Sequence, residues 1–495
     1  MATPAQGFAK AVEMCNNNGH CRKFDAGTMC PSYRVTRDEK HLTRGRANTL
    51  RLALSGQLAV VPSPQPSPAS RRGSELPPLP SGGGWGEGAL EAVHEAMDLC
   101  VGCKGCKRDC PTGVDMAKMK VEFLHHYKAR HGYTLKDKLV AYLPDYAPWA
   151  SRLAPLLNLR DKIPGLSGLS EKLLGFSAKR TLPQWQRKTF WSQLKTVRAA
   201  PVEALRPIDK PRTGPVENRL RAPGERVWSA TREDVLAARK PVVLFVDTFN
   251  GYFESENAIA ALKVLLALDY TTYVATKTVA TGKSLCCGRT YLASGMVDQA
   301  KAKAAELISV LLPFAEKGIA IVGLEPSCLL TLRDETLVMG LDNIEGLRGA
   351  AQKVADHAML FEEFLAAEAA AGKLDALVAR LKPANKPILV HGHCHQKAFA
   401  AVAPLMEVLK LIPGAKPELI ESSCCGMAGS FGYEASHFEV SMQMAELSLL
   451  PAVRANPDAI VVADGTSCRH QIRDGAQREA VHVATLLASL LQNRV

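Results

Sequence analysis

The stretch that decides the N-terminal fold is Cys100-Val-Gly-Cys103-Lys-Gly-Cys106-Lys-Arg-Asp-Cys110-Pro111. Its spacing, C-x2-C-x2-C-x3-C-P, surrounds a cubane iron–sulfur cluster with thiolates, and the fourth cysteine is directed to a neighbouring cluster when two are present. Gly102 and Gly105 allow the tight backbone curl that brings three thiols together. Structural zinc is the alternative, but zinc usually takes its ligands from two separated pairs. The run therefore predicts an iron–sulfur cluster.

A degenerate copy of this run opens the chain, as Cys15-Asn-Asn-Asn-Gly-His-Cys21 followed by Cys30-Pro31. Asn18 stands where the second cysteine of the run would be. Two copies predict two 4Fe-4S clusters with crossed ligation. The expected ligands are Cys100, Cys103, Cys106 and Cys30 for one cluster, and Cys15, Cys21 and Cys110 for the other.

The missing thiolate at Asn18 leaves three readings of the second cluster. The corner is empty and gives a 3Fe-4S cluster, or His20 supplies a non-cysteine ligand, or the site has decayed and holds no metal. Basic residues follow the first copy, at Arg37, Arg44 and Arg46. They either neutralise an anionic cluster or form a solvated basic face.

The composition changes abruptly between the two runs. Of the 30 residues from 59 to 88, 18 are Pro, Gly or Ser, so we expect a disordered insertion looped out of one helical, ferredoxin-like domain over residues 1–58 and 89–130. Residues 131–240 then predict helices, which either pack on the cluster domain or lie on a membrane surface, followed by a connector. That connector, from 177 to 240, carries 15 Lys or Arg against 6 Asp or Glu.

The C-terminal part is a duplication over residues 241–385 and 386–495. Pro241–Asn250 and Pro387–Cys394 each open a copy with a short apolar run, Cys286-Cys287-Gly288 is echoed by Cys424-Cys425-Gly426, and Cys328 by Cys468. Corresponding cysteines lie 138 and 140 residues apart. Alternation of apolar runs with helical stretches predicts an α/β unit with a parallel sheet in each copy. The fold class is thus α/β plus α.

The two copies differ in their thiols. The second offers four, at Cys394, Cys424, Cys425 and Cys468, whereas the first offers three, at Cys286, Cys287 and Cys328. In the first copy we expect Asn250 in the place of Cys394. Adjacent cysteines favour a larger, irregular cluster or a thiol-redox role over a simple metal ion. His391, His393 and His395 are either ligands, proton carriers or orienting core residues.

Composition limits the class of protein. The 14 cysteines fall in tight clusters in a chain with no signal peptide and no apolar run of 18 residues, which favours metal binding in a reducing compartment. The formal charge of +12 comes without a nucleic-acid motif, so we expect no nucleic-acid partner. We expect a cytoplasmic protein, either free or peripheral on the inner membrane.

Together these motifs resemble the iron–sulfur subunits of membrane-associated flavin dehydrogenases, including those of glycolate oxidase and anaerobic glycerol-3-phosphate dehydrogenase, and the C-terminal half of fused FAD-linked D-2-hydroxyglutarate and D-lactate dehydrogenases. The stretch Cys15–Tyr33 and the segment Glu325-Pro-Ser-Cys328-Leu-Leu-Thr331 carry the resemblance, which covers nearly the whole chain outside residues 59–88. It implies an oxidoreductase subunit acting on CH–OH donors. Electrons would pass from a flavin, through the clusters, to quinone or another acceptor.

Two departures qualify that expectation. No dinucleotide fingerprint of the G-x-G-x-x-G kind follows a strand, so FAD is expected on a partner polypeptide. The related domain of heterodisulfide reductase ends in C-x2-C, whereas Thr331 and Gln471 take that second position here, which favours a four-thiolate site in the second copy. Two alternatives stay open: disulfide reduction at the Cys-Cys-Gly domain, and a truncated, non-catalytic remnant.

Overall fold

Short helices carry both cysteine runs of the N-terminal part. The computed structural model of the chain describes residues 7–23, 27, 29–58, 87–196, 227–276 and 284–492, so the predicted insertion lies almost wholly outside them. The helices are α1 (Phe8–Glu13), η1 (His20–Arg22), α2 (Pro31–Thr36), η2 (Glu39–His41), α3 (Thr43–Leu54), α4 (Glu87–Asp98), α5 (Gly105–Asp109) and α6 (Met116–His131). They bury one core of apolar side chains and cysteines. The predicted helical cluster domain is confirmed.

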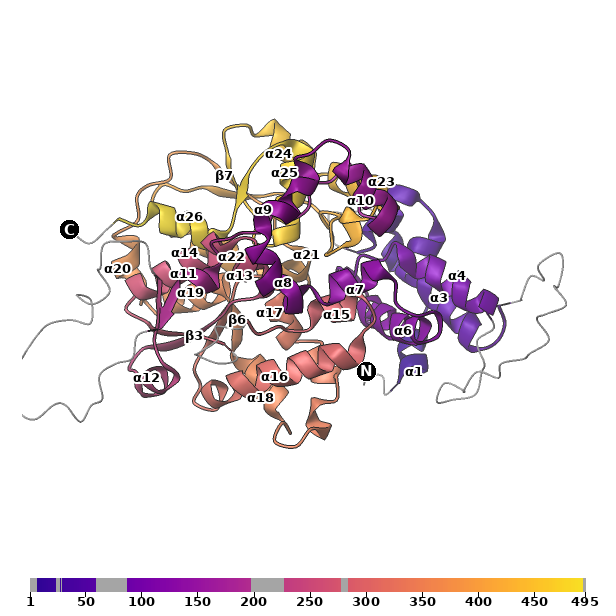
Figure 1. Cartoon of the computed structure of the whole chain (residues 1–495), viewed down its shortest axis with the longest axis horizontal. Coiled ribbons are helices and arrows are strands. Elements are labelled where there is room, and N and C mark those ends of the chain that lie inside the picture. The colour runs from indigo at the N-terminus through magenta and orange to yellow at the C-terminus, as the bar shows by residue number, and fades with distance from the viewer. Residues whose placement is uncertain are drawn as a thin grey trace, which may run out of the picture.

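A second helical segment follows and crosses both C-terminal repeats (Figure 1). It contains α7 (Leu135–Ala141), α8 (Leu143–Arg152), α9 (Ala154–Leu157), η3 (Asn158–Asp161), α10 (Leu166–Leu174) and α11 (Phe190–Gln193). Helix α7 packs on α15 and α8 on α13 of the first repeat, and Phe176 bridges to Glu434 of the second. These helices therefore pack mainly on the repeats. One sequence alternative placed them against the cluster domain, and the contacts differ from it. Strand β1 (Leu194–Thr196) pairs in parallel with β2 (Val227–Ser229), and residues 197–226 of the basic connector lie outside the described part.

The first repeat alternates helices with four strands. Its elements are α12 (Arg232–Ala237), β3 (Pro241–Phe245), α13 (Thr248–Tyr252), α14 (Ser255–Ala267), β4 (Thr271–Val274), α15 (Arg289–Ala293), α16 (Val297–Ala315), β5 (Ile321–Gly323), α17 (Pro326–Leu332), η6 (Thr336–Val338), η7 (Leu341–Asn343), α18 (Ala350–His357), β6 (Ala358–Leu360), α19 (Phe361–Ala370) and α20 (Asp375–Val378).

The second repeat follows the same plan. Its elements are β7 (Ile388–Val390), α21 (Cys394–Ala398), α22 (Val402–Lys410), β8 (Pro417–Leu419), η8 (Phe431–Tyr433), α23 (Phe438–Glu446), α24 (Leu449–Ala455), β9 (Ile460–Val462), α25 (Thr466–Ala476), β10 (Ala480–Val481) and α26 (Val483–Leu490). The strand orders are β4-β3-β5-β6 and β8-β7-β9-β10, and all pairs are parallel. The duplicated α/β architecture is confirmed.

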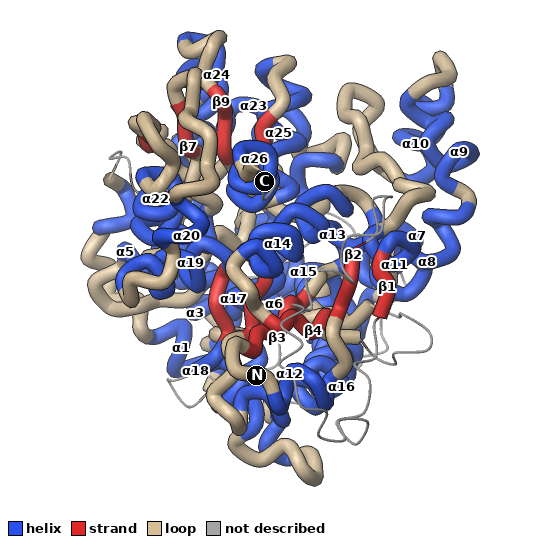
Figure 2. Tube along the Cα trace, turned by 90° about the vertical axis from the view of Figure 1, so that its left-hand side faces the viewer, coloured by secondary structure: helices blue, strands red, loops and turns tan. Residues whose placement is uncertain are grey.

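The two sheets are stacked in alternating layers with helices. Successive residues of β3 face opposite cores: Val243 packs with the residues of α16 and α18, and Val242 with those of α14, α19, α22 and α26. Ile388 and Val390 of the second sheet join this latter core, so these helices lie between the sheets (Figure 2). Burial on both faces explains why the inner strands β3, β5, β7 and β9 are continuous apolar runs without polar alternation. Among the described residues, no helix combines the length and apolarity needed to cross a bilayer.

Candidate metal centres

The four cysteines assigned to the first cluster line one small cavity. Cys30 from the start of α2 faces Cys100, Cys103 and Cys106 of the predicted loop across it. Burial, together with neighbouring cysteines, raises the pKa of the Cys103 and Cys106 thiols well above its ordinary value. Thiols that resist ionisation in this way need a metal to become thiolates. The donor set and the cavity thus fit an iron–sulfur cluster.

The loop curls through left-handed residues, as its chemistry requires. Gly102 has φ of 59°, which fits the predicted role of glycine. The second left-handed residue is Lys104, with φ of 60°, whereas Gly105 is the first residue of α5 and has an ordinary helical conformation. The prediction for Gly105 was therefore wrong. Cys30 also adopts φ of 50°, which turns its sulfur toward the loop ahead of α2.

Backbone and side-chain donors aim at two of these sulfurs. The Thr43 N–H lies 3.0 Å from Cys30 Sγ and the Thr43 hydroxyl 3.1 Å from it, while the Met116 N–H lies 3.3 Å from Cys106 Sγ. Hydrogen bonds to cluster sulfurs stabilise the more reduced state and raise the potential. Sequence reading gives no hint of these donors, because they come from helix starts whose position depends on tertiary packing.

Positive side chains surround the same cavity. Arg46 lines it, is 2% exposed, and donates to Ala96 O at 2.8 Å and Ser32 Oγ at 2.9 Å. Arg44 forms an ion pair with Glu39 and also lies near the Cys15 and Cys21 thiols. Arg46 and Arg44 therefore lie where their positive charges would neutralise an anionic cluster. Lys104 lines the cavity as well, and sequence reasoning missed it.

Cys15, Cys21 and Cys110 belong to the same N-terminal core. Cys15 and Cys21 are buried, Cys110 is half-buried against that core, and the turn it begins ends at Gly113, beside Met14. Burial, with Cys30 and Cys15 nearby, raises the pKa of Cys21 to about 11. Cys21 thus lies near Cys15 and Cys30, and a centre shared by Cys15, Cys21 and Cys110 stays a prediction.

The side chain of Asn18 takes part in local hydrogen bonds on an exposed loop. Its Oδ1 accepts from the His20 N–H at 2.8 Å, and its Nδ2 donates to Asn16 Oδ1 at 2.6 Å. His20 is half-buried at the start of η1. Asn18 thus stabilises the loop. The three alternatives for the fourth ligand position of the second cluster stay predictions.

The Cys100–Cys110 loop is docked on the second repeat. Cys103 packs with Cys394 and Cys424 in one buried contact cluster. His395 Nε2 lies 3.2 Å from Gly102 O, and Arg108 donates to Lys397 O at 2.7 Å. The thiols of the N-terminal cavity and those of the second repeat are therefore direct neighbours, although more than 280 residues separate them in sequence.

A buried ionic cluster fixes the same loop to the first repeat. Lys104 Nζ lies 2.5 Å from Asp334 and 2.7 Å from Glu335, and its side chain has no exposed area. Lys118 and Lys107 add contacts to Asp334 at 2.6 and 2.7 Å. Burial alone would raise the pKa of Asp334, but the lysines outweigh it and hold the pKa below its usual value. We call this group the Lys104–Asp334 cluster.

The Cys-Cys-Gly motif has one physical explanation in both repeats. Gly288 and Gly426 adopt φ of 85° and 82°, and a Cβ there would come within 2.7 Å of Ala300 O and 2.4 Å of Ser441 O. Only glycine lets the backbone turn under the following helix at this distance. Each glycine N–H then points at the sulfur two residues earlier, at 3.3 and 3.4 Å.

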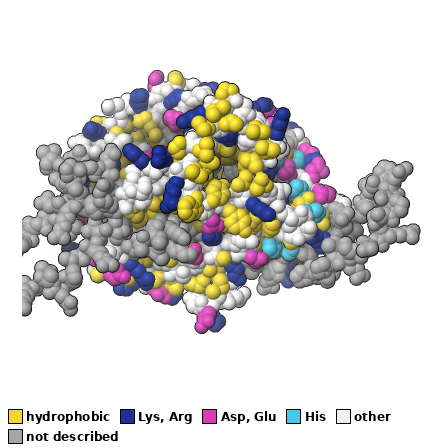
Figure 3. Space-filling view, viewed as in Figure 1, with side chains coloured by type: hydrophobic (Ala, Val, Ile, Leu, Met, Phe, Trp, Pro, Cys, Tyr) yellow, Lys and Arg dark blue, Asp and Glu magenta, His cyan; other side chains and the backbone are white. Residues whose placement is uncertain are grey.

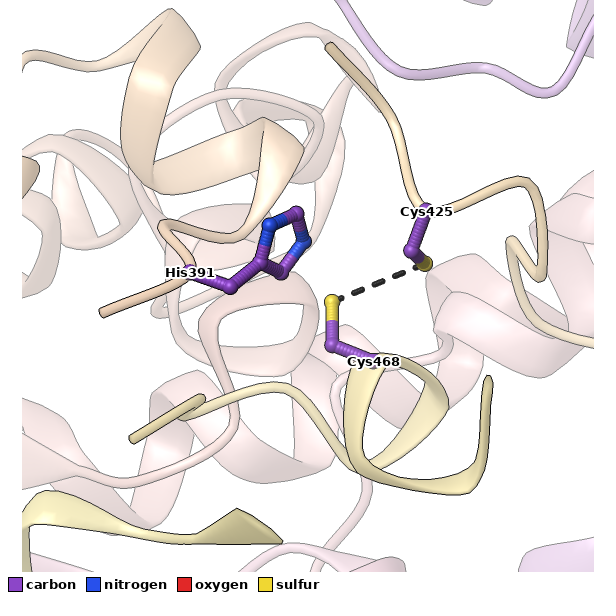
Figure 4. A group of neighbouring side chains, drawn as sticks. All are labelled: His391, Cys425 and Cys468. Carbon is purple, nitrogen blue, oxygen red and sulfur yellow. Dashed lines mark hydrogen bonds between the residues drawn. The ribbon is translucent and has the colours of Figure 1, made fainter. Parts of the chain in front are cut away.

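The second repeat gathers four buried thiols. Cys468 Sγ lies 3.6 Å from Cys425 Sγ (Figure 4). Hydrogen bonding from Cys424 lowers the pKa of Cys394 to about 6, and hydrogen bonds from Cys424 and Cys468 lower that of Cys425. A metal that bound these four sulfurs would displace the protons of the thiols.

The three histidines of this repeat have different places. His391, fully buried, directs its ring to Cys425 and Cys468, and one donor atom from each of these residues lies within 4.8 Å of the others (Figure 4). Its Nδ1 is fixed at 2.9 Å from Ser422 Oγ. His393 caps α21, and His395 faces the cluster loop. Of the three, His391 has the position of a metal ligand.

The first repeat gathers Cys286, Cys287 and Cys328, which share hydrogen bonds through Cys287. Helix α13 begins after the N-cap Asp247, and α21 after the N-cap His393. The first helical residue is thus Thr248 in one repeat and Cys394 in the other. Asn250, third in its helix, corresponds to Gln396. The predicted alignment of Asn250 with Cys394 was therefore wrong by two residues, but no cysteine stands at the corresponding position in either alignment.

Comparison with known proteins supports this picture. The profile of the 4Fe-4S dicluster domain matches residues 11–114, and that of the cysteine-rich CCG domain matches residues 388–473. The chain is 27% identical over 474 residues, 93% of its length, to the D-2-hydroxyglutarate dehydrogenase of Escherichia coli, of which it covers 42%. It is 25% identical over 68% of its length to one of the subunits of the E. coli anaerobic glycerol-3-phosphate dehydrogenase, covering 72% of that protein. A probable glycolate oxidase iron–sulfur subunit of Bacillus subtilis is 24% identical over 80% of the chain, with 83% of that protein covered.

The chain spans less than half the length of the D-2-hydroxyglutarate dehydrogenases it matches. Its dicluster domain implies iron–sulfur clusters, and the resemblance predicted from the sequence is confirmed. The chain therefore combines a 4Fe-4S dicluster domain with a cysteine-rich CCG domain, and is an iron–sulfur electron-transfer component distantly related to the corresponding subunits and regions of dehydrogenases.

Proposed function

We propose that this chain carries electrons from a flavin-dependent dehydrogenase that oxidises a small 2-hydroxy acid, such as D-2-hydroxyglutarate, D-lactate or glycolate. The flavin would be FAD held outside this chain, and the final acceptor a quinone. Iron–sulfur clusters supply one-electron steps, which a flavin reduced by two electrons can feed in turn. The relatives named as dehydrogenases and dehydrogenase subunits support this donor class.

The ligands proposed for the clusters are the cysteines predicted from the sequence. Cys30, Cys100, Cys103 and Cys106 would hold one cluster, and Cys15, Cys21 and Cys110 the second, which is a 3Fe-4S cluster or has a further ligand. Cys394, Cys424, Cys425 and Cys468 would hold a centre in the second repeat. Cys286, Cys287 and Cys328 would be an incomplete set.

One observation carries the electron-transfer proposal: Cys103, Cys394 and Cys424 form one buried contact cluster. Buried apolar contact between ligands of two centres keeps both out of water and at one fixed separation. The Lys104–Asp334 cluster holds that separation from the other side of the loop. This packing supports electron transfer between a cluster at Cys103 and a centre at Cys394 and Cys424.

The same burial argues against the disulfide-reductase alternative. Cys394, Cys424, Cys425 and Cys468 are between 1% and 7% exposed, so a disulfide substrate has no path to them in this conformation. An electron needs no such path, which favours electron transfer at these thiols.

The experiment has two stages. The anaerobically purified chain, reconstituted with iron and sulfide, is titrated with dithionite and followed by paramagnetic resonance; at least two reducible signals are expected, and their absence would overturn the proposal. In the native cell, deletion of the chain should abolish quinone-linked oxidation of one of the three acids. Wild-type chain should restore it and Cys103→Ser should not. Unchanged oxidation of all three acids would reject the proposed substrate class.

A further inference from the structure

Large apolar side chains gather on one exposed surface. Of the thirteen large hydrophobic residues exposed in the described parts of the chain, nine belong to α7–α10 and the turns between them. They are Leu135, Tyr142, Trp149, Leu153, Leu156, Leu157, Ile163, Leu169 and Leu173. Figure 3 shows hydrophobic side chains spread over the region where Figure 1 places α8, α9 and α10. We call these nine residues the apolar face.

The helices bury small residues and expose large ones. Helix α8 packs on the protein through Ala147 and Ala150, whereas Trp149 is 66% exposed. Helix α10 has no buried residue, and its Leu173 is 69% exposed. This arrangement inverts the usual amphipathic helix of a soluble protein, in which the large apolar residues face the core. A contiguous exposed apolar surface of this kind marks an interaction site.

The charges within the segment are sorted by sign. Each of its acids has a partner: Asp137 pairs with Lys128, Asp145 with Lys303, and Asp161 with Arg160, while Glu171 accepts from the Ala178 N–H. By contrast, four exposed bases have no carboxylate partner in the described part of the chain, namely Lys138, Arg152, Lys162 and Lys172. The surface therefore combines exposed hydrocarbon with unneutralised positive charge.

We propose that the apolar face seats this protein on the surface of a bilayer containing anionic lipids. Tryptophan and leucine side chains enter the boundary of headgroups and acyl chains, and lysine and arginine at the rim bind anionic headgroups. Arg152 already stacks on the Trp149 ring, 4.5 Å from its centroid, with its charged end beside the apolar ring. A protein partner is the weaker fit, because lysine is depleted in the core of protein interfaces.

The helices that carry the apolar face are too short to cross a membrane. Helix α8 has 10 residues, α9 has 4 and α10 has 9, so none approaches the ~20 residues needed to cross the hydrocarbon core. Leu153 alone separates α8 from α9, and Pro164 and Gly165 precede α10. The segment therefore lies in the interface plane, a binding mode independent of which substrate or acceptor the clusters serve.

The test measures sedimentation of the full reconstituted chain with two kinds of vesicle, phosphatidylcholine alone and phosphatidylcholine with phosphatidylglycerol. Strong binding is expected only to the second, and it should weaken as salt rises. The triple variant Trp149→Ser/Leu153→Ser/Leu156→Ser should bind at least roughly tenfold more weakly. Lys162→Gln should reduce affinity by roughly fivefold at low salt.

A matched control replaces exposed apolar residues elsewhere, as Leu337→Ser/Leu419→Ser/Leu447→Ser. This variant should bind like wild type. Absence of wild-type binding to either vesicle would overturn the proposal, and so would equal binding by the apolar-face triple variant. If that variant instead lost a flavoprotein partner while vesicle binding persisted, the occupant would be a protein and not a membrane.

A fluorescence measurement tests the same proposal with a single substitution. Addition of anionic vesicles should shift the emission of Trp149 to shorter wavelength, and brominated lipid should quench it, because the ring enters the apolar boundary. The difference between wild type and Trp149→Phe isolates this signal from the other four tryptophans. An identical response in both proteins would contradict seating through the apolar face.

Discussion

The two C-terminal repeats share a fold but have different side chains where thiols would meet. Both have the same strand order and the same strained Cys-Cys-Gly turn. Only the second has a cysteine at the start of the helix after its first strand, and a buried histidine beside the thiols. In the first, Thr248 takes that helical position.

A second shared feature shows what the first repeat retains. Asp334 lies six residues after Cys328, and Asp474 lies six residues after Cys468. Asp334 binds Lys104 of the cluster loop, whereas Asp474 faces the buried Arg180 of the helical connector and accepts from Thr181 at 2.7 Å. Equivalent acids thus attach different parts of the chain. The first repeat, although short of one thiol, therefore binds the loop that carries Cys100, Cys103 and Cys106.

The largest expected effect separates the repeats by metal content. Cys394→Ser should remove the centre of the second repeat, because an incomplete ligand set lowers metal affinity severely. Iron and sulfide per chain should fall, and one paramagnetic signal should disappear. Thr248→Ser, at the corresponding position of the first repeat, is the matched control and should change neither quantity.

Equal iron loss in both variants would break the distinction between the repeats. Unchanged iron in Cys394→Ser would show that the second repeat holds its metal without this thiol, for which His391 is the candidate substitute.

The next effect concerns the Lys104–Asp334 cluster. Asp334→Asn leaves buried Lys104 and Lys118 short of negative charge, so we expect a loss of about 3 kcal/mol in the free energy of unfolding, read from the urea midpoint. Because the cluster loop then loses its anchor on the first repeat, it can shift relative to both repeats, and magnetic coupling between the two proposed centres should weaken as well. Glu316→Gln, which removes an exposed ion pair with Lys353, should cost less than about 0.5 kcal/mol. Coupling unchanged in Asp334→Asn would show that the loop is held by other contacts.

The spacing of the cysteines was sufficient to predict the cluster loops, because cluster ligation imposes a local pattern. The apolar runs were sufficient to predict the inner strands, because burial on both faces leaves no polar alternation. Prediction from the sequence failed where the answer depends on contacts distant in sequence. The sequence places Lys104 in a loop and gives no sign of its partner Asp334, which lies 230 positions further along the chain. The alignment of Asn250 with Cys394 failed because it did not match the helix N-caps Asp247 and His393, which pair Cys394 with Thr248.

The repeats also meet through an ion pair whose strength depends on pH. Burial disfavours the charged form of Glu254 in the first repeat, but Arg469 of the second outweighs it and lowers the pKa to about 2. A lowered carboxyl pKa adds stability that is complete above the unfolded value of 4.5 and is lost as pH falls toward 2. Glu254→Gln should therefore cost about 3 kcal/mol at pH 7, with a deficit that shrinks below pH 4.5, measured by urea unfolding of the two proteins. A deficit independent of pH would assign the loss to packing.

The smallest effect concerns the buried hydrogen bonds of Asn250 in the first repeat. Asn250 donates to Asp247 Oδ2 at 2.6 Å and accepts from Asn257 at 3.0 Å, all of them buried. Asn250→Ala should cost about 1 to 2 kcal/mol by leaving two polar groups without partners, and should leave iron content unchanged. Gln396, its counterpart, donates instead to Glu362 and Asp464, one from each repeat. Because Gln396→Ala leaves two buried carboxyl groups facing each other, it should destabilise the chain more than Asn250→Ala does. The reverse order would mean that hydrogen bonding inside the first repeat, and not the junction between repeats, sets the stability of this pair of domains.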